Sequence, residues 1–215
     1  MARSRLLVIC LLFVTLAGAA HRRARKSAAP FDYYLLSLSW APDFCAGPAG
    51  NKDPLECAPG RRLGFVVHGL WPQSNTGRGP ENCGSVSPVS AAIITVMLKY
   101  MPGQSLIQHE WTIHGSCAGV SAEQYFASVR QARDSVQIPS ELASPTQTLS
   151  ESATQLEAQF AAANPGFPQS AFRATCVNGK LQEARICLDK NLKPRQCTAS
   201  AGECAAPSMT ILPPR

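Results

Sequence analysis

The segment FRATCVNGKLQEARICLD, residues 172–189, has the pattern of a β-hairpin. Two runs of strand-forming residues flank Asn178-Gly179, and Asn-Gly is the strongest short hairpin signal because both residues tolerate a positive φ. The aromatic and aliphatic segments FDYYLLSLSW (31–40) and RLGFVVHGLW (62–71) also predict strands. Strands near both ends of the chain, one pair joined by a tight turn, indicate a largely antiparallel sheet.

Apolar residues at helical spacing lie between these strands. Ser121 is a suitable N-cap for one of the predicted helices, and Asn164-Pro165-Gly166 would stop another. The Gly- and Pro-rich residues 41–60 are expected to form a loop. The chain therefore predicts one α+β domain over residues 31–215, with a largely antiparallel sheet packed against several helices. The predicted helices are 87–101, the region of 109–117, 121–136 and 149–167.

The N-terminus has the pattern of a secretory signal peptide. Arg3 and Arg5 precede an apolar run that ends in small residues, where Ala17-Gly18-Ala19 fits a cleavage site. Residues 1–20 are therefore predicted to be a signal peptide, and the basic residues 21–30 a disordered arm. The mature protein is expected to be secreted or periplasmic, with no membrane anchor after cleavage.

The cysteine count agrees with export to an oxidising compartment. Of nine cysteines, Cys10 lies in the signal peptide, and the remaining eight predict four disulfides. No C-x-x-C pair is present, which argues against a zinc ribbon. Eight cysteines allow 105 pairings, so the count alone leaves the connectivity open. The eight are Cys45, Cys57, Cys83, Cys117, Cys176, Cys187, Cys197 and Cys204.

The formal charge of +6 overstates how basic the folded domain is. Six of the 20 Lys and Arg residues precede Ser27, which leaves 14 of them against 14 Asp and Glu. A broadly basic surface for nucleic-acid binding is therefore excluded. If the domain binds a polyanion, it does so at a local site.

The stretch HEWTIHGSC (109–117) contains two of only four histidines in the chain. A zinc helix needs histidines at i and i+4, about 40° apart around the axis, whereas His109 and His114 would lie about 140° apart. On an unbroken helix Glu110 shares a face with His114, where its carboxylate would raise the basicity of the imidazole. This pattern favours acid–base chemistry over metal binding, and no metal or cofactor is expected.

RNA cleavage suits such a set of residues. With the cysteines in disulfides there is no free thiol nucleophile, but RNA supplies its own nucleophile, the 2′-OH. Imidazoles can act as both base and acid near neutral pH. His68, at the end of the strand in FVVHGLWPQ, is the second candidate, and Trp71 and Trp111 could stack on bases.

The segments FVVHGLWPQ (65–73) and HEWTIHGSC (109–117) resemble the two active-site segments of the T2 ribonucleases, approximately H-G-L-W-P and H-E-W-x-K-H-G-[TS]-C. FDYYLLSLSWAPDFC (31–45) resembles the first core strand of that family, and CVNGKLQEARICLD (176–189) its C-terminal strands. The resemblance covers about residues 31–204. It implies a monomeric secreted endoribonuclease that cleaves single-stranded RNA, not DNA, by metal-independent transesterification through 2′,3′-cyclic phosphates, with low base specificity.

Residue roles carried over from the family concern both proton transfer and substrate binding. The resemblance implies that His114 is the general base and His68 the general acid, although the reverse assignment stays open. Glu110 would orient the histidines or stabilise the transition state, and His109 would contact the phosphate. Trp71 would stack on the base 5′ of the scissile phosphate. Gln73 is a possible base-edge contact, and the implied disulfides are Cys83–Cys117, Cys176–Cys204, Cys187–Cys197 and Cys45–Cys57.

One position departs from the family pattern. Ile113 stands where the family usually has a lysine that would neutralise charge on the phosphorane. Lys99 and Arg78 are candidates to supply that charge from elsewhere. The alternative is a catalytically attenuated RNA-binding protein on the same fold, and a zinc hydrolase ranks third because of the histidine spacing.

Overall fold

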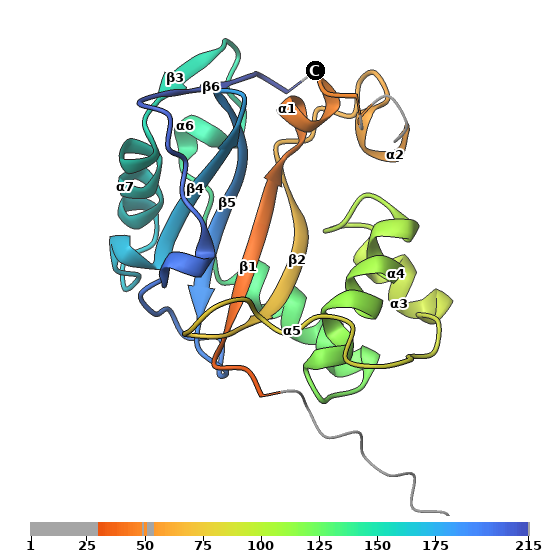
Figure 1. Cartoon of the computed structure of the whole chain (residues 1–215). Helices are drawn as coiled ribbons and strands as arrows, with labels where there is room; N and C mark the ends of the chain where they lie inside the picture. The colour runs from red at the N-terminus through yellow and green to blue at the C-terminus, as the bar shows by residue number, and fades with distance from the viewer. Residues whose placement is uncertain (1–29, 49, 51–53, 215) are drawn as a thin grey trace, which may run out of the picture.

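The computed structural model describes residues 30–48, 50 and 54–214 (Figure 1). The predicted signal peptide and nearly all of the predicted basic arm lie outside these residues. Within the described part, no helix has the length and apolar content needed to cross a bilayer.

A single sheet organises the described residues. It has six strands in the order β2-β1-β5-β6-β3, with β4 paired to the other side of β5. All pairs are antiparallel except β5 with β6, so the predicted α+β fold with a largely antiparallel sheet is confirmed. The strands are β1 (Tyr33–Trp40), β2 (Phe65–Gln73), β3 (Leu149–Glu151), β4 (Phe172–Val177), β5 (Lys180–Leu188) and β6 (Met209–Ile211).

Helices flank this sheet. Figure 1 shows α7 beside β4 and the pair α3 and α4 beyond β2, with α1 and α2 near the end of β1. Short 3-10 turns occupy 115–117, 169–171 and 199–201. The helices are α1 (Ala41–Cys45), α2 (Pro54–Cys57), α3 (Ala91–Met97), α4 (Gln104–Ile113), α5 (Ala122–Asp134), α6 (Ser140–Ala143) and α7 (Ala153–Ala163).

The predicted hairpin is present. Asn178 and Gly179 have φ values of 51° and 71° and connect β4 to β5. Ser121 caps α5 in a full capping box, in which its side chain and that of Gln124 satisfy backbone N–H groups reciprocally. Helix α7 ends just before Asn164, as expected.

Three predicted boundaries are wrong. The 41–60 segment was expected to be loop but contains α1 and α2, which the Cys45–Cys57 disulfide joins. The helix expected over 87–101 covers only residues 91–97: Ser90 is its N-cap, and Leu98 is its C-cap. The helix expected over 149–167 is preceded by a separate strand, β3, and starts after the N-cap Ser152.

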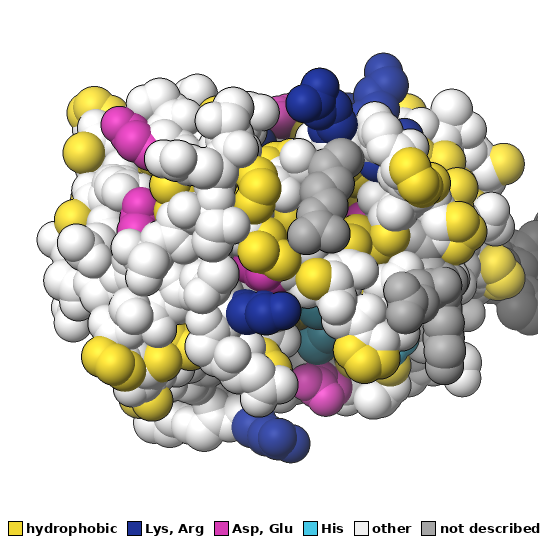
Figure 2. Space-filling view, turned by 90° about the horizontal axis from the view of Figure 1, so that it is seen from above, with side chains coloured by type: hydrophobic (Ala, Val, Ile, Leu, Met, Phe, Trp, Pro, Cys, Tyr) yellow, Lys and Arg dark blue, Asp and Glu magenta, His cyan; other side chains and the backbone are white. Residues whose placement is uncertain are grey.

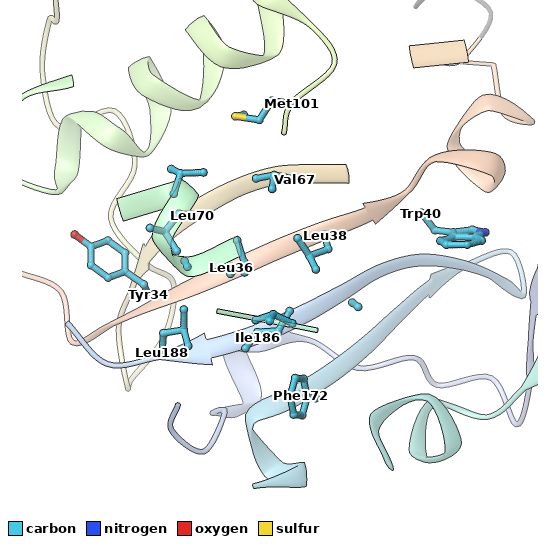
Figure 3. Close-up of a cluster of buried hydrophobic side chains, with 14 of the residues drawn as sticks. Tyr34, Leu36, Leu38, Trp40, Val67, Leu70, Met101, Phe172, Ile186 and Leu188 are labelled. Atoms are coloured by element: carbon cyan, nitrogen blue, oxygen red, sulfur yellow. The ribbon is translucent and has the colours of Figure 1, made fainter. Parts of the chain in front are cut away.

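The two faces of β1 have different roles. Leu36, Leu38 and Trp40 lie in the main core, together with side chains from β2, β5 and the helices (Figure 3). The opposite face carries Tyr33 and Leu35 in a small second cluster that includes Cys187 and against which Trp71 packs. Further along this second face come Ser37 and Ser39, whose small side chains leave room above the sheet. The candidate site lies there.

The eight cysteines of the described residues form four disulfides with the pairing that the family resemblance implies. Cys83–Cys117 fastens the loop after β2 to the turn that follows α4. Cys176–Cys204 and Cys187–Cys197 hold the segment before β6 against the β4–β5 hairpin. The disulfides therefore fix both segments that border the candidate site.

Candidate active site

His68 occupies a β-bulge in β2. Ser37 of β1 pairs with Gly69, but the next residue, Leu38, pairs with Val67, so His68 has no partner in the ladder. A bulge re-aims the side chain of its extra residue, and bulges are common beside active sites. The imidazole of His68 is consequently 36% exposed on a strand that is otherwise largely buried.

Glu110 and His114 come from the C-terminal end of α4. Glu110 is 1% exposed, in the last turn of the helix. The helix ends at Ile113, and His114 follows it with φ −107° and ψ −47°. The imidazole of His114 is 9% exposed, and its Nδ1 has no hydrogen-bond partner among the described residues. Because Nδ1 is also shielded from solvent, Nε2 is the nitrogen through which this imidazole could exchange a proton with a substrate.

The indole of Trp71 joins these side chains. Its Nε1 donates a 2.7 Å hydrogen bond to Glu110 Oε2. Its ring centroid lies 5.1 Å from that of His68 and 5.2 Å from that of His114. The two imidazoles therefore contact the same indole, one from β2 and one from the end of α4.

The two histidines have opposite electrostatics. Burial lowers the pKa of His114 to about 4, and the nearby charges of His68 and His109 act in the same direction. Burial also lowers the pKa of His68, but the hydrogen bond and charge of a buried glutamate, Glu183, together with the charge of Glu110, outweigh it, and the net shift is upward. One imidazole therefore favours the neutral form and the other the charged form.

The expected pairing of Glu110 with His114 is wrong. One oxygen of Glu110, Oε2, accepts the hydrogen bond from Trp71. The other oxygen, Oε1, lies 3.6 Å from Nε2 of His68. The expectation assumed an unbroken helix, whereas His114 lies beyond the helix end. Burial raises the pKa of the Glu110 carboxyl to about 7, although the charge of His68 and the Trp71 hydrogen bond oppose this.

Trp111 does not belong to the site, so its predicted contact with substrate is wrong. It is buried, its Nε1 donates to the Ser87 carbonyl at 3.0 Å, and its ring packs against Tyr125 and Phe126. An indole enclosed in this way has no face left for a base.

The remaining predicted positions surround the site. His109 is exposed on α4, close enough to lower the pKa of His114 by its charge. Gln73 lies two residues beyond Trp71, at the end of β2. Ile113 is half-buried at the last position of α4. The two candidate substitute cations, Lys99 and Arg78, are both exposed, and no contact joins either to the site histidines among the described residues.

Two charged residues of β5 were missed by sequence reasoning. Glu183 is 2% exposed, and its Oε1 accepts a 2.6 Å hydrogen bond from His68 Nδ1. Arg185 binds the other oxygen of Glu183 through Nε and Nη2, at 2.7 and 2.6 Å. Its guanidinium carbon lies 5.4 Å from the Trp71 ring centroid. The available signal was a charged pair at alternate positions in a strand that is otherwise mostly apolar.

A hollow of about 570 Å³ adjoins His68. Glu183 and Lys180 of β5 line it on one side, and Phe44 and Leu106 on another. Figure 2 looks onto this face, where histidine side chains lie recessed between basic and acidic groups. The volume of the hollow falls in the range of small-molecule sites in proteins. Among the described residues, no group of three or more His, Cys, Asp or Glu side chains is placed to hold a metal ion.

Comparison with known proteins agrees with this geometry. A family model described as "Ribonuclease T2 family" matches residues 31–197, which include every site residue named above. The chain belongs to the ribonuclease T2 family. Both candidate active-site segments, 65–73 and 109–117, lie within the matched residues.

Individual relatives and a solved structure show the same likeness. A "Probable ribonuclease" of Haemophilus influenzae is 34% identical over 185 residues, covering 80% of this chain and 63% of the relative. A "Ribonuclease" of Aeromonas hydrophila is 36% identical over 115 residues, covering 52% of this chain and 51% of the relative. The chain thus spans between half and two thirds of these relatives. The crystal structure of RNase NT in complex with 5′-AMP matches with a TM-score of 0.66 and 18% identity, covering 87% of this chain and 100% of that one, which supports the fold.

The buried Glu110 makes stability depend on pH. Its pKa is about 7 in the folded protein against 4.5 for an ordinary carboxyl, so the folded state binds more protons and loses stability as pH rises through this window. Glu110→Gln has no carboxyl to ionise at this position, so it does not lose this part of its stability as pH rises. Relative to the wild type, the variant should gain on the order of 1–3 kcal/mol in free energy of unfolding between pH 4 and pH 8.

Urea unfolding at several pH values measures this difference. Glu141→Gln, which removes one negative charge from an exposed residue of α6, is the matched control for the change in net charge. A difference for Glu110→Gln that does not change with pH contradicts the prediction.

Proposed function

We propose that the protein is an endoribonuclease that cleaves single-stranded RNA by acid–base transesterification through 2′,3′-cyclic phosphates. The observation that carries this is the pair of imidazoles on one indole, with the pKa of His68 raised and that of His114 lowered to about 4. Above about pH 4 His114 is neutral, while the raised pKa of His68 favours its protonated form, so one histidine can hold a proton while the other does not. Such a pair can take a proton from one oxygen and give one to another in the same transition state.

The opposite pKa directions favour one assignment of roles. His114, neutral above about pH 4, removes the proton of the 2′-OH, and the oxygen attacks the adjacent phosphorus. As the bond from phosphorus to the 5′-oxygen breaks, protonated His68 gives its proton to that oxygen. The products are a 2′,3′-cyclic phosphate and a free 5′-OH. In a slower second step water takes the place of the 5′-OH, the roles reverse, and a 3′-phosphate results.

Glu110 and His109 are proposed to act on the phosphate. With a pKa of about 7, Glu110 is largely protonated in the acidic range. Its Oε1, on the side of His68, can then donate a hydrogen bond to a phosphorane oxygen without adding a negative charge. The exposed His109 would contact the phosphate from the side of α4.

The base and the rest of the strand are proposed to bind beside the histidines. The partly exposed indole of Trp71 offers a stacking surface, and Gln73 on the same face of β2 could reach a base edge. Stacking tolerates every base, so specificity for the base should be low. The hollow beside His68 has room for an adjoining nucleotide. DNA lacks the 2′-OH and is not expected to be a substrate.

We also propose that the protein works outside the cytoplasm, either secreted or in a periplasm. Four disulfides among the described residues would be difficult to maintain in a reducing compartment. The signal-peptide pattern of residues 1–20 supports the same location.

An assay of purified protein on single-stranded RNA in EDTA tests the function. We expect products that end in 2′,3′-cyclic phosphate, and none when the ribose at the cleavage site is 2′-deoxy. The rate should rise as His114 loses its proton near pH 4 and fall again as His68 loses its own. Absence of cyclic-phosphate ends would overturn the proposal.

Ile113 is the observation that favours the attenuated alternative. Ile113→Lys places a cation at the end of α4, and we expect kcat to rise by about 10- to 100-fold, because one charge on the phosphorane is worth about 10²–10³ in rate. The neighbouring half-buried Thr112, changed to Lys, adds the same charge at a different angle and is the matched control. If the wild-type protein only binds RNA, cleavage should appear only in Ile113→Lys. Equal rates in the wild type and in Ile113→Lys would mean that the missing lysine does not limit catalysis.

A further inference from the structure

Two charged side chains of β5, Glu183 and Arg185, hold the imidazole of His68 from behind. Glu183 Oε1 lies 2.6 Å from His68 Nδ1. Glu183 Oε2 accepts a 2.7 Å hydrogen bond from Nε of Arg185 and lies 2.6 Å from Nη2 of the same guanidinium. Nη1 of Arg185 donates a 2.7 Å hydrogen bond to the Ala201 carbonyl. This chain of contacts thus runs from the candidate catalytic imidazole to a backbone carbonyl outside the sheet.

The sheet is built to allow this contact. Glu183 pairs with Ser39 and Arg185 with Ser37 across β1, so the two charged side chains share a face with the two serines. The small serine side chains leave space for the Glu183 carboxylate to reach over β1. The bulge in β2 turns His68 toward it from the other side.

The far end of this chain of contacts is also fixed. Ala201 lies between Cys197 and Cys204, and both cysteines are bonded to the β4–β5 hairpin. Gly202, with φ 78°, comes so close that a Cβ there would lie 2.8 Å from Arg185 Nη1. Two disulfides and a glycine therefore hold the carbonyl that receives the guanidinium.

A carboxylate in this position has a defined effect on the imidazole. Glu183 accepts at Nδ1, which keeps the hydrogen on that nitrogen and leaves Nε2 as the atom that exchanges protons. Nε2 is the nitrogen on the side of Glu110, within the site. Although burial opposes it, the hydrogen bond from His68 and the charge of Arg185 lower the pKa of Glu183 to about 2, so the group stays ionised.

We propose that Glu183 is a positioning residue of the reaction, which holds His68 with Nε2 toward the RNA and stabilises its charged form, while Arg185 holds Glu183. This inference rests on the proposed ribonuclease activity. Glu183 itself touches no reacting atom. It acts on the leaving-group proton only through His68.

The charged groups that face His68 predict two opposite shifts. They are Glu183 and Arg185 on β5, Glu110 on α4, and His114 just after α4. Glu183→Gln keeps the shape and an acceptor oxygen but removes a negative charge, so the pKa of His68 should fall. Arg185→Gln removes a positive charge that lowers the pKa of His68, so this variant should raise it. A general loss of packing has no reason to produce shifts of opposite sign.

The experiment combines an NMR titration of ¹⁵N-labelled histidine without RNA and a pH–rate profile with RNA. In Glu183→Gln we expect kcat to fall about 10- to 100-fold, part of the 10²–10⁴-fold that a positioned acid contributes, with little change in KM. The alkaline limb of the profile should move to lower pH in Glu183→Gln and to higher pH in Arg185→Gln. Glu157→Gln is the matched control, since Glu157 is another buried carboxylate near an arginine, Arg173, and no histidine is among the groups that shift its pKa.

Each outcome separates this inference from the activity on which it rests. A His68 titration that is unchanged in Glu183→Gln, in a protein that still cleaves RNA, overturns the positioning role alone. The positioning role is also overturned if Glu183→Gln lowers kcat equally at every pH and Glu157→Gln lowers it by the same factor. A wild-type protein that cleaves no RNA overturns the proposed function, and the positioning role of Glu183 with it.

Discussion

Replacing His68 or His114 with alanine is expected to lower kcat for RNA by about 10²–10⁴-fold, the usual contribution of a positioned acid or base. Both imidazoles contact the Trp71 indole, and one is predisposed to hold a proton while the other is not. No other histidine contacts this indole among the described residues, so neither loss has an evident substitute. Steady-state kinetics on a dinucleotide substrate would measure both effects.

A substrate with a good leaving group separates the two roles. A nucleoside 3′-phosphodiester of 4-nitrophenol expels a stable phenolate that needs no proton from the enzyme. If His68 is the acid, His68→Ala should recover most of its lost rate on this ester, whereas His114→Ala should stay slow because the 2′-OH still needs a base. The reverse pattern would exchange the two assignments.

His109→Ala provides the internal comparison. His109 is exposed on α4 and is proposed to contact the phosphate without moving a proton. Its loss should raise KM more than it lowers kcat, and by about tenfold at most, since exposed charged contacts are worth little. An effect of His109→Ala on kcat as large as that of His114→Ala would mean that the proton-transfer pair has been misassigned.

Long elements with a clear pattern could be predicted from the sequence, and short ones could not. The Asn178-Gly179 turn and the Ser121 capping box are local signals, and both are present in the structure. Strands β3 and β6 have three residues each; β3 pairs with β6, and β6 pairs in turn with Lys180, the first residue of β5. A three-residue strand has no periodicity to detect, and its stability comes from partners distant in the chain.

The site was predictable in its residue types and not in its contacts. Scarce histidines and the two motifs indicated His68 and His114. The partner of Glu110 depended on where α4 ends, and the structure places that end one residue before His114. Glu183 and His68 are 115 residues apart in the sequence, and in the sheet their strands lie on either side of β1. Only the order of strands in the sheet could therefore reveal this contact.

Gly69→Ala is expected to lower kcat by about 10²-fold, because a displacement of about 1 Å in a catalytic group can have that effect. Gly69 lies beside the bulge, paired with Ser37. A Cβ built there overlaps both Glu110 Oε2 and Trp71 Nε1, the two atoms joined by the hydrogen bond at the centre of the site. Glu110 is almost fully buried and cannot move aside freely. Such overpacking should also lower the free energy of unfolding by about 1–3 kcal/mol.

A double-mutant cycle shows whether the space itself is what matters. Glu110→Ala removes one of the two groups that the new methyl would strike, so adding Gly69→Ala to that background should lower kcat much less than in the wild type. Urea unfolding of the same four proteins gives the corresponding coupling in stability. Equal effects of Gly69→Ala in both backgrounds would contradict the prediction. Gly69 would then be required for the space beside Trp71 Nε1 or for the backbone of the bulge that aims His68, and not for the space that Glu110 occupies.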